Sequence, residues 1–272
     1  MNSLGLQMYT LHKEMESAAH PQEVYRRIKA AGYDSVQGAV EPGMTPAMHR
    51  QMLEETGLFP LTYPAYTGGP EGGILGVLQN PDAIMKGARD LRVNLVEIPT
   101  ILSEYRGSAA DYARFAALMN QAASPLASEG IRLLYHHHAL ELHRFEDGRT
   151  GLDILVQETD PELVEFCLDV HWLQAGGVNP AKWIEKMKGR MTLIHYKDYG
   201  IAGNTQDIGS VPRRFMAVGE GNIDWDSITA AARAANIRHF VVEQDSGDRD
   251  MFDCITASAR YMREILGLPG MG

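Results

Sequence analysis

Short, mostly apolar runs alternate along the chain with segments of helical periodicity. Eight runs have the length and character of buried strands: residues 4–9, 34–37, 59–63, 94–98, 131–136, 164–169, 191–195 and 239–243. Between them, residues 21–31 begin with a proline and stop at Gly32, and residues 45–56 stop at Gly57, which are ordinary helix signals. We expect further helices at residues 80–91, 108–129, 151–158, 180–188, 224–235 and 249–266.

This alternation continues through all 272 residues without a low-complexity linker or a change of composition. It predicts an α/β fold, a (β/α)8 TIM barrel, which typically takes about 250 residues. The main alternative, a doubly wound open sheet, usually has a glycine-rich turn after its first strand. Residues 8–12 read MYTLH and contain no glycine. We therefore expect one barrel domain over residues 1–272.

The strand ends carry polar side chains of the ligand type. Inward-facing residues alternate along barrel strands, and the last of them reach the active-site face. On strands five to eight the inward sets begin with Leu134, Cys167, Leu193 and Val241. They continue as His136 and His138, Asp169 and His171, His195 and Lys197, and Glu243 and Asp245. Strands one and four add Gln7, Tyr9 and Glu97. Such polarity is costly to bury unpaired, so it predicts a wet or metal-filled pocket.

The most informative segment is YHHHALE at residues 135–141, directly after the apolar residues 131–134. Strand alternation puts His136 and His138 on one face, and Tyr135 and His137 on the face that packs against helices. Taken alone, the segment also fits a solvated loop or hydrogen-bonded histidines closing a strand. Recurrence of Asp, His or Glu at three further strand ends favours a functional site.

Strands six to eight offer a carboxylate, an imidazole and a second carboxylate, namely Asp169, His195 and Glu243. These donors suit one divalent ion, Mn²⁺, Co²⁺, Mg²⁺ or Zn²⁺. No thiolate site is expected, because Cys167 lies within an apolar strand as a small hydrophobe. A divalent ion with open positions can hold sugar oxygens and polarise a carbonyl, and a nearby Glu or His then removes the adjacent proton.

Composition narrows the class of partner. The formal charge of −10, with 44% hydrophobic and 22% charged residues, is that of a globular protein without a basic nucleic-acid-binding face. The N-terminal residues lack the features of a signal peptide, and no apolar stretch approaches the roughly 20 residues of a membrane span. We therefore expect a cytoplasmic protein that binds a small molecule.

Five ordered motifs resemble the xylose isomerase-like barrel superfamily, and most closely its sugar phosphate isomerase/epimerase group. They are YHHHALEL at residues 135–142, EFCLDVHW at 165–172, IHYKD at 194–198, VGEGNIDW at 218–225 and VVEQD at 241–245. The resemblance runs in order along the chain and is strongest after residue 130. It implies a TIM barrel that acts on a sugar and often forms homo-oligomers.

The resemblance also implies a ligand set: Glu, Asp, His and Glu from strands five to eight around one divalent ion. The last three positions match Asp169, His195 and Glu243. The first is occupied by His136, and the next carboxylate is Glu141. We expect the loop to fold back so that Glu141 ligates, leaving His136 and His138, with Glu243, for acid/base work. In the alternative, His136 ligates and Glu141 contacts a ligand or the substrate.

Further side chains are expected to contact the substrate. The family often uses the lysine matching Lys197 to hold a substrate oxygen, and strand parity alone brings His171 and Gln7 to the pocket. Arg213 and Arg214, in a long loop over residues 199–218, could bind a phosphate or carboxylate or simply be solvated. The glycine-rich residues 67–73 form a candidate lid.

The resulting hypothesis is a metal-dependent sugar or sugar phosphate isomerase/epimerase acting through an enediolate. The alternative is a lyase or dehydratase that eliminates a β-substituent from a 3-keto-sugar, keto-glycoside or inosose, and an extra histidine acid would suit its leaving group. Negative charge and the single ligand set disfavour a DNA repair endonuclease of the same fold. A noncatalytic sugar-binding barrel is disfavoured because such a buried cluster is costly without a cation.

Overall fold

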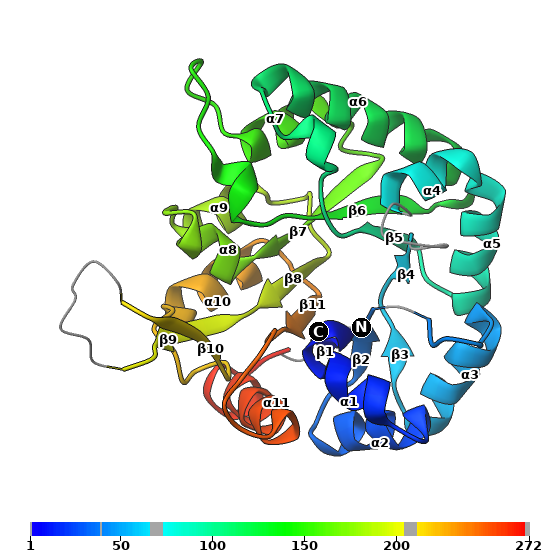
Figure 1. Cartoon of the computed structure of the whole chain (residues 1–272), viewed down its shortest axis with the longest axis vertical. Helices are drawn as coiled ribbons and strands as arrows, with labels where there is room; N and C mark the ends of the chain where they lie inside the picture. Colours follow the sequence, from blue (N-terminus) through cyan, green and yellow to red (C-terminus); the bar gives the residue numbers. More distant parts are fainter. Residues whose placement is uncertain (1, 39, 66–72, 204–210, 270–272) are drawn as a thin grey trace.

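The computed structural model describes residues 2–38, 40–65, 73–203 and 211–269. A parallel sheet of nine strand segments, in the order β3-β2-β1-β11-β8-β7-β6-β5-β4, curves around a central core (Figure 1). The segments are β1 Ser3–Gln7, β2 Ser35–Gln37, β3 Phe59–Pro60, β4 Tyr63–Pro64, β5 Leu95–Ile98, β6 Arg132–His136, β7 Val164–Asp169, β8 Leu193–Tyr196 and β11 His239–Val242. Only Leu61 and Thr62 separate β3 from β4 in the chain, so these segments are two halves of the third strand and the ring has eight positions. The predicted TIM barrel is confirmed.

Helices cover the outside of the ring (Figure 1). They are α2 Pro21–Ala30, α3 Pro46–Thr56, α4 Gly73–Gln79, α5 Pro81–Leu91, α6 Ala109–Leu126, α7 Gly151–Glu158, α9 Pro180–Lys186, α10 Trp225–Ala234 and α11 Met251–Arg260. Their ends follow local chemistry: the Thr45 hydroxyl accepts the Met48 amide at the start of α3, and Gly57 ends it with a φ of +77°. Three short helices were not predicted: α1 His12–Ser17, α4 Gly73–Gln79 and α8 Val170–Ala175.

The segment expected to be one long loop over residues 199–218 instead contains an antiparallel hairpin of β9 Asp198–Ile201 and β10 Arg213–Met216. Residues 204–210, between its two strands, lie outside the described residues. The buried Asp198 carboxylate secures the hairpin base by accepting the backbone amides of Gly219 and Gly221, at 2.9 and 3.0 Å. Arg214 on this hairpin pairs with Asp248. The proposed lid at residues 67–73 falls almost entirely outside the described residues.

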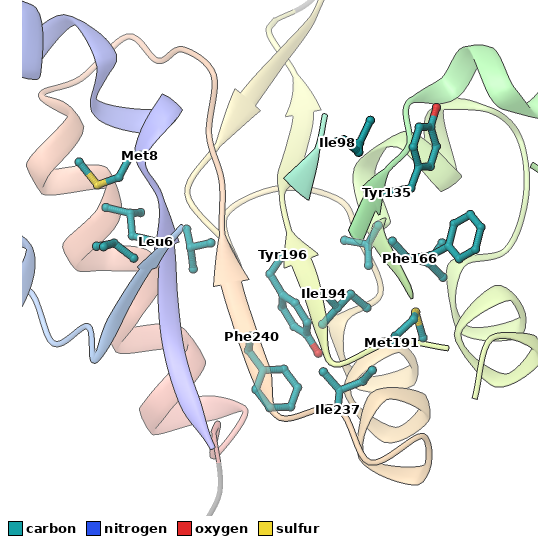
Figure 2. Packing of buried hydrophobic residues seen from close by; sticks show 14 of the residues in the cluster. Leu6, Met8, Ile98, Tyr135, Phe166, Met191, Ile194, Tyr196, Ile237 and Phe240 are labelled. Atoms are coloured by element: carbon teal, nitrogen blue, oxygen red, sulfur yellow. The ribbon is translucent and has the colours of Figure 1, made fainter. Parts of the chain in front are cut away.

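The hydrophobic core has two layers. The inner layer fills the ring with Leu61, Leu95, Leu134, Cys167, Leu193 and Val241. It includes all four apolar residues predicted to begin the inward sets, so the strand parity is confirmed. The outer layer packs strands against helices and includes Leu6, Tyr135, Phe166, Ile194 and Phe240 (Figure 2). The inner layer packs the interior of the barrel directly below the polar strand ends.

Among the residues that the structure describes, no helix combines the length and apolar character needed to cross a membrane.

One buried histidine in the helical layer should make stability depend on pH. His49 Nε2 lies 3.2 Å from the Tyr25 hydroxyl, and burial lowers the pKa of His49 from 6.5 to about 4. Neutral His49 makes its full contribution to the stability of the folded protein above about pH 6.5. This stability is lost as the pH falls toward 4, because the unfolded chain binds a proton more readily than the folded protein does. Between pH 8 and pH 5 the wild type should lose about 2 kcal/mol more stability than His49→Gln. Urea unfolding at both pH values measures this difference, and equal losses would contradict it.

Candidate metal centre

Four side chains from four neighbouring strand positions converge at the carboxyl end of the barrel. They are His136 at the end of β6, Asp169 at the end of β7, His195 on β8 and Glu243 directly after β11. One ligand-type atom of each lies within 4.8 Å of those of the others. All four side chains are buried. We call these residues the donor group.

The contacts of His195 show how its two nitrogens are used. Its Nε2 lies 2.9 Å from the Gln37 side-chain carbonyl oxygen, which can only accept a hydrogen bond. Its Nδ1 faces the carboxylates, 2.8 Å from Glu243 Oε2 and 4.0 Å from Asp169 Oδ2. A ligating histidine usually donates its other N–H to a carbonyl or carboxylate in this way. Burial lowers the pKa of His195, but Cys167 and Glu243 outweigh it and raise this pKa well above its usual value, so Nδ1 holds a proton toward Glu243. A cation at the centre of the donor group would take the place of this proton.

Two unpaired atoms support the same interpretation. Asp169 Oδ1 accepts the His171 amide at 2.8 Å and so begins helix α8, whereas its Oδ2 is buried. Asp169 Oδ2 and His136 Nδ1 have no hydrogen-bond partner among the described residues. Unpaired buried polar atoms are costly, and a cation would satisfy both. The donor group therefore fits a divalent ion bound through nitrogen and oxygen.

The electrostatics of the group are those of crowded, buried charges. Burial raises the pKa of Asp169, although Lys197 opposes the rise, and the neighbouring Glu243 adds to it. Burial acts on Glu243 too, but attraction by His195 and Lys197 outweighs it and lowers the pKa of Glu243. Lys197 suffers the same burial, and Glu243, Asp169 and Asp245 raise its pKa. Its ammonium lies 2.7 Å from Asp245 and remains charged.

Glu141 is not a member of the donor group, so the position expected for it is corrected. The loop does fold back, as η4 Ala139–Leu142, but the carboxylate closes its own loop. It accepts the Tyr135 hydroxyl at 2.5 Å and the His138 amide at 2.9 Å. The alternative arrangement, with His136 in the ligand position, is the one that the geometry favours.

The neighbouring His137 joins β6 to β7. Its Nε2 accepts the Asp169 amide at 3.1 Å, and its Nδ1 donates to the His138 carbonyl at 2.9 Å.

A cavity of about 740 Å³ opens above the donor group. Most of the residues predicted to face inward line it: Gln7, Tyr9, Glu97, His136, His138, His195, Lys197, Glu243 and Asp245. Trp172 also lines it. His171 is not among the described lining residues. Because the chain turns from β7 into α8 at Asp169, strand parity no longer applies, and the His171 ring packs against Trp172, Tyr199 and Phe215. Arg213 and Arg214 are also outside this lining.

Sequence reasoning missed Gln37, the partner of His195. Gln37 is the last residue of β2 and is fully buried. The same inward alternation that placed Glu97 in the pocket would have found it, since Ser35 and Gln37 share a face of the strand. Strand two lacks a conspicuous apolar run, and no polar residue was assigned to its inner face.

A family model for the xylose isomerase-like TIM barrel matches residues 25–265. The chain belongs to this family. It is 27% identical over 162 residues to an inosose dehydratase from Geobacillus thermodenitrificans (strain NG80-2), covering 55% of this chain and 53% of the relative. It is 23% identical over 180 residues to an inosose dehydratase from Clostridium botulinum (strain Alaska E43 / Type E3), covering 62% and 59%. The chain thus spans about half the length of the curated relatives that it matches.

Two solved structures share the fold. A sugar phosphate isomerase/epimerase from Parabacteroides distasonis ATCC 8503 superposes with a TM-score of 0.78 at 21% identity, covering 99% of this chain and 95% of the other. The IOLI protein with a binding zinc atom superposes with a TM-score of 0.68 at 15% identity, covering 98% of both chains. These similarities show that the shared fold covers nearly the whole chain.

Substitutions should separate the two possible first ligands. Asp169→Asn and His136→Ala should each lose a bound divalent ion, because each removes a donor at the centre. Glu141→Gln should keep the ion and lose about 1–3 kcal/mol of stability, because it disturbs a buried carboxylate's hydrogen bonds. Elemental analysis after loading with Mn²⁺ or Zn²⁺ measures the first effect and urea unfolding the second. Loss of the ion in Glu141→Gln with retention in His136→Ala would reverse the assignment.

Gln37 should act on the metal through His195. Gln37→Leu removes the acceptor for the Nε2 proton and should weaken metal binding about 10- to 100-fold, the usual effect of losing such a support. Gln37→Glu retains an acceptor at this position and should bind the metal more tightly than Gln37→Leu. Competition with a metal-sensitive dye gives the affinities. Equal affinity of all three proteins would show that the contact does not orient His195.

Proposed function

We propose that this protein is a divalent-metal-dependent carbon–oxygen lyase. In the reaction, a proton leaves the carbon next to a ketone on a sugar-like ring, and the substituent on the following carbon is expelled. Two substrates of this type are an inosose, which would lose water, and a 3-keto-glycoside, which would lose the group joined through its glycosidic oxygen. The inosose dehydratases among the curated relatives support a lyase, as does the presence in one pocket of a cation-binding donor group and a free imidazole.

The observation that carries the proposal is the state of His138. Its partly exposed ring lines the cavity. Because its Nδ1 is buried, Nε2 is the ring nitrogen that a substrate in the cavity can reach. Burial, assisted by the positive charge of Lys197, lowers the pKa of His138 to about 4, so the imidazole is neutral near pH 7. A neutral imidazole with a free nitrogen is equipped to accept a proton from carbon. His136 is committed to the donor group and is less suited to this role.

The elimination balances with His138 as the proton carrier. The C–H electron pair forms the new C=C bond, the C–O bond to the leaving group breaks, and His138 passes the abstracted proton to the departing oxygen. One group on one face of the substrate can perform both transfers. When bound, a divalent ion would polarise the ketone and make the neighbouring C–H bond more acidic.

Two other side chains prepare the environment. The Lys197 ammonium can donate to negative charge that develops on a substrate oxygen. Trp172 lies beside both groups, with its ring 5.4 Å from that of His138 and 5.0 Å from the Lys197 nitrogen. Its bulk keeps water from this side of the cavity, which strengthens electrostatic contacts there.

The second candidate is the isomerase or epimerase that the sequence analysis ranked first. Its reaction begins with the same removal of a proton from carbon as the lyase reaction. It then needs a second proton carrier, which returns a proton to another carbon or to the opposite face of the same carbon. Glu97 favours this candidate, because it lines the same cavity and burial raises its pKa, although His195, Gln37 and Thr62 oppose the rise. The two reactions differ in whether the leaving group departs.

The fate of a substrate that reacts in D₂O distinguishes them. The Mn²⁺-loaded protein is incubated in D₂O with an inosose or a methyl 3-keto-glucoside. We expect loss of water or methanol, with a conjugated product that absorbs in the ultraviolet. Recovery of an epimer or isomer carrying deuterium, without release of a leaving group, would instead select the second candidate.

His138→Asn should lower kcat at least about 100-fold, because it removes the proton carrier. The variant should retain its metal ion, since His138 is outside the donor group. Steady-state rates and elemental analysis on the same preparation test both statements. An undiminished kcat would exclude His138 as the carrier.

A further inference from the structure

The cavity is built asymmetrically. The donor group and His138 come from strands β6, β7, β8 and β11 and the residues that follow them. A second side comes from residues after β1 and β2: Met8, Tyr9, His12, Met15, Glu16, Val40, Glu41 and Pro42. Strands β1 and β6 are four places apart in the ring of eight, so the two sides face each other. The volume of about 740 Å³ is in the range that holds drug-sized ligands, larger than one sugar ring requires.

The second side presents a prepared aromatic surface. Tyr9 is 56% exposed although it lines the cavity, which is unusual for a large aromatic side chain. Its ring stacks on that of His12, with centroids 4.6 Å apart and planes inclined by 10°. The His12 Nδ1 lies 2.7 Å from the Tyr9 carbonyl, and the Gln7 side chain accepts the Tyr9 amide at 3.3 Å. These contacts hold the stacked pair in place before any ligand arrives.

The charges of the lining select against an anionic ligand. Among the described lining residues Lys197 is the one Lys or Arg, and three carboxylates lie within 4.0 Å of its ammonium: Asp169, Glu243 and Asp245. The second side adds two more carboxylates, Glu16 and Glu41. A phosphate here would meet negative charge without an available guanidinium or ammonium. The second side therefore suits an uncharged, ring-shaped group.

We propose that Tyr9 and His12, with the apolar residues around them, form a subsite for a second, uncharged ring of the substrate. The inference rests on the proposed function, and it selects a 3-keto-glycoside with a sugar ring as leaving group over a single-ring inosose or a sugar phosphate. The second ring lies against the exposed surface of Tyr9 while the keto-sugar meets the donor group and His138.

Three matched probes test this subsite with the Mn²⁺-loaded protein. They are glyceryl 3-keto-glucoside, a disaccharide in which 3-keto-glucose is linked to glucose, and glyceryl 3-keto-glucoside 6-phosphate. Glycerol and glucose both carry hydroxyls beside the leaving oxygen, so the first two probes release alkoxides of similar basicity, and a difference in kcat/KM reports contacts with the second ring. A ring stacked on tyrosine contributes about 0.5–1.5 kcal/mol, which corresponds to up to about a tenfold preference. We expect the disaccharide to be preferred by about that factor, through KM, and the phosphate to be the poorest probe.

Variants assign the preference to Tyr9. Tyr9→Ala should reduce the ratio of disaccharide to glyceryl glycoside kcat/KM to near unity, and Tyr9→Phe should preserve it because the ring remains. Met48→Ala is the matched control, since Met48 is 54% exposed and lies outside the cavity lining. An equal kcat/KM for both sugars in the wild type, a preference that survives Tyr9→Ala, or faster turnover of the phosphate overturns the subsite. Absence of leaving-group release from all three probes counts against the proposed function instead.

Discussion

The burial of two carboxylates in one small space is the constraint on which this end of the barrel depends. Asp169 and Glu243 are both nearly inaccessible to water, and charges of the same sign repel strongly where water is excluded. Positive charge must therefore be present among them. Lys197 supplies part of it, and the free oxygen of Asp169 and the free nitrogen of His136 mark where a divalent ion would supply the rest.

Neighbouring residues hold the members of the donor group in position. Gln37 holds His195 so that one nitrogen faces the carboxylates, and His137 ties the backbone of Asp169 to the preceding strand. Below them the inner layer of aliphatic side chains fixes the height of the strand ends. The chemistry is thus carried by rigid strands, whereas the opposite side of the cavity is built from short helices and loops. This division is common in TIM barrels, where strand ends provide catalysis and loops provide specificity.

Strand periodicity predicted the fold and most of the candidate site, because buried parallel strands impose strict alternation. It placed His136, Asp169, His195 and Glu243 on the inner face, and the structure brings them together. Parity failed where a helix begins directly after a strand. His171 lies beyond the last residue of β7, on a helix with its own geometry, and was expected in the pocket for that reason.

The other errors had different physical causes. Glu141 was assigned to the metal by resemblance, but a carboxylate three residues after the capping residue of a turn can accept that residue's amide and close its own loop, as Glu141 does. The hairpin of β9 and β10 escaped notice because its strands are short and partly exposed, so they lack the apolar signal of the barrel strands. The spacing of apolar residues predicts neither hydrogen bonds within a loop nor the pairing of partly exposed strands.

The most direct test of the account is a crystal structure of the Mn²⁺-loaded protein with an anomalous difference map. The account predicts one strong peak within bonding distance of His136, Asp169, His195 and Glu243, with Glu141 still bound to Tyr135. A peak coordinated by Glu141 in place of His136, or no peak within the donor group, would contradict it.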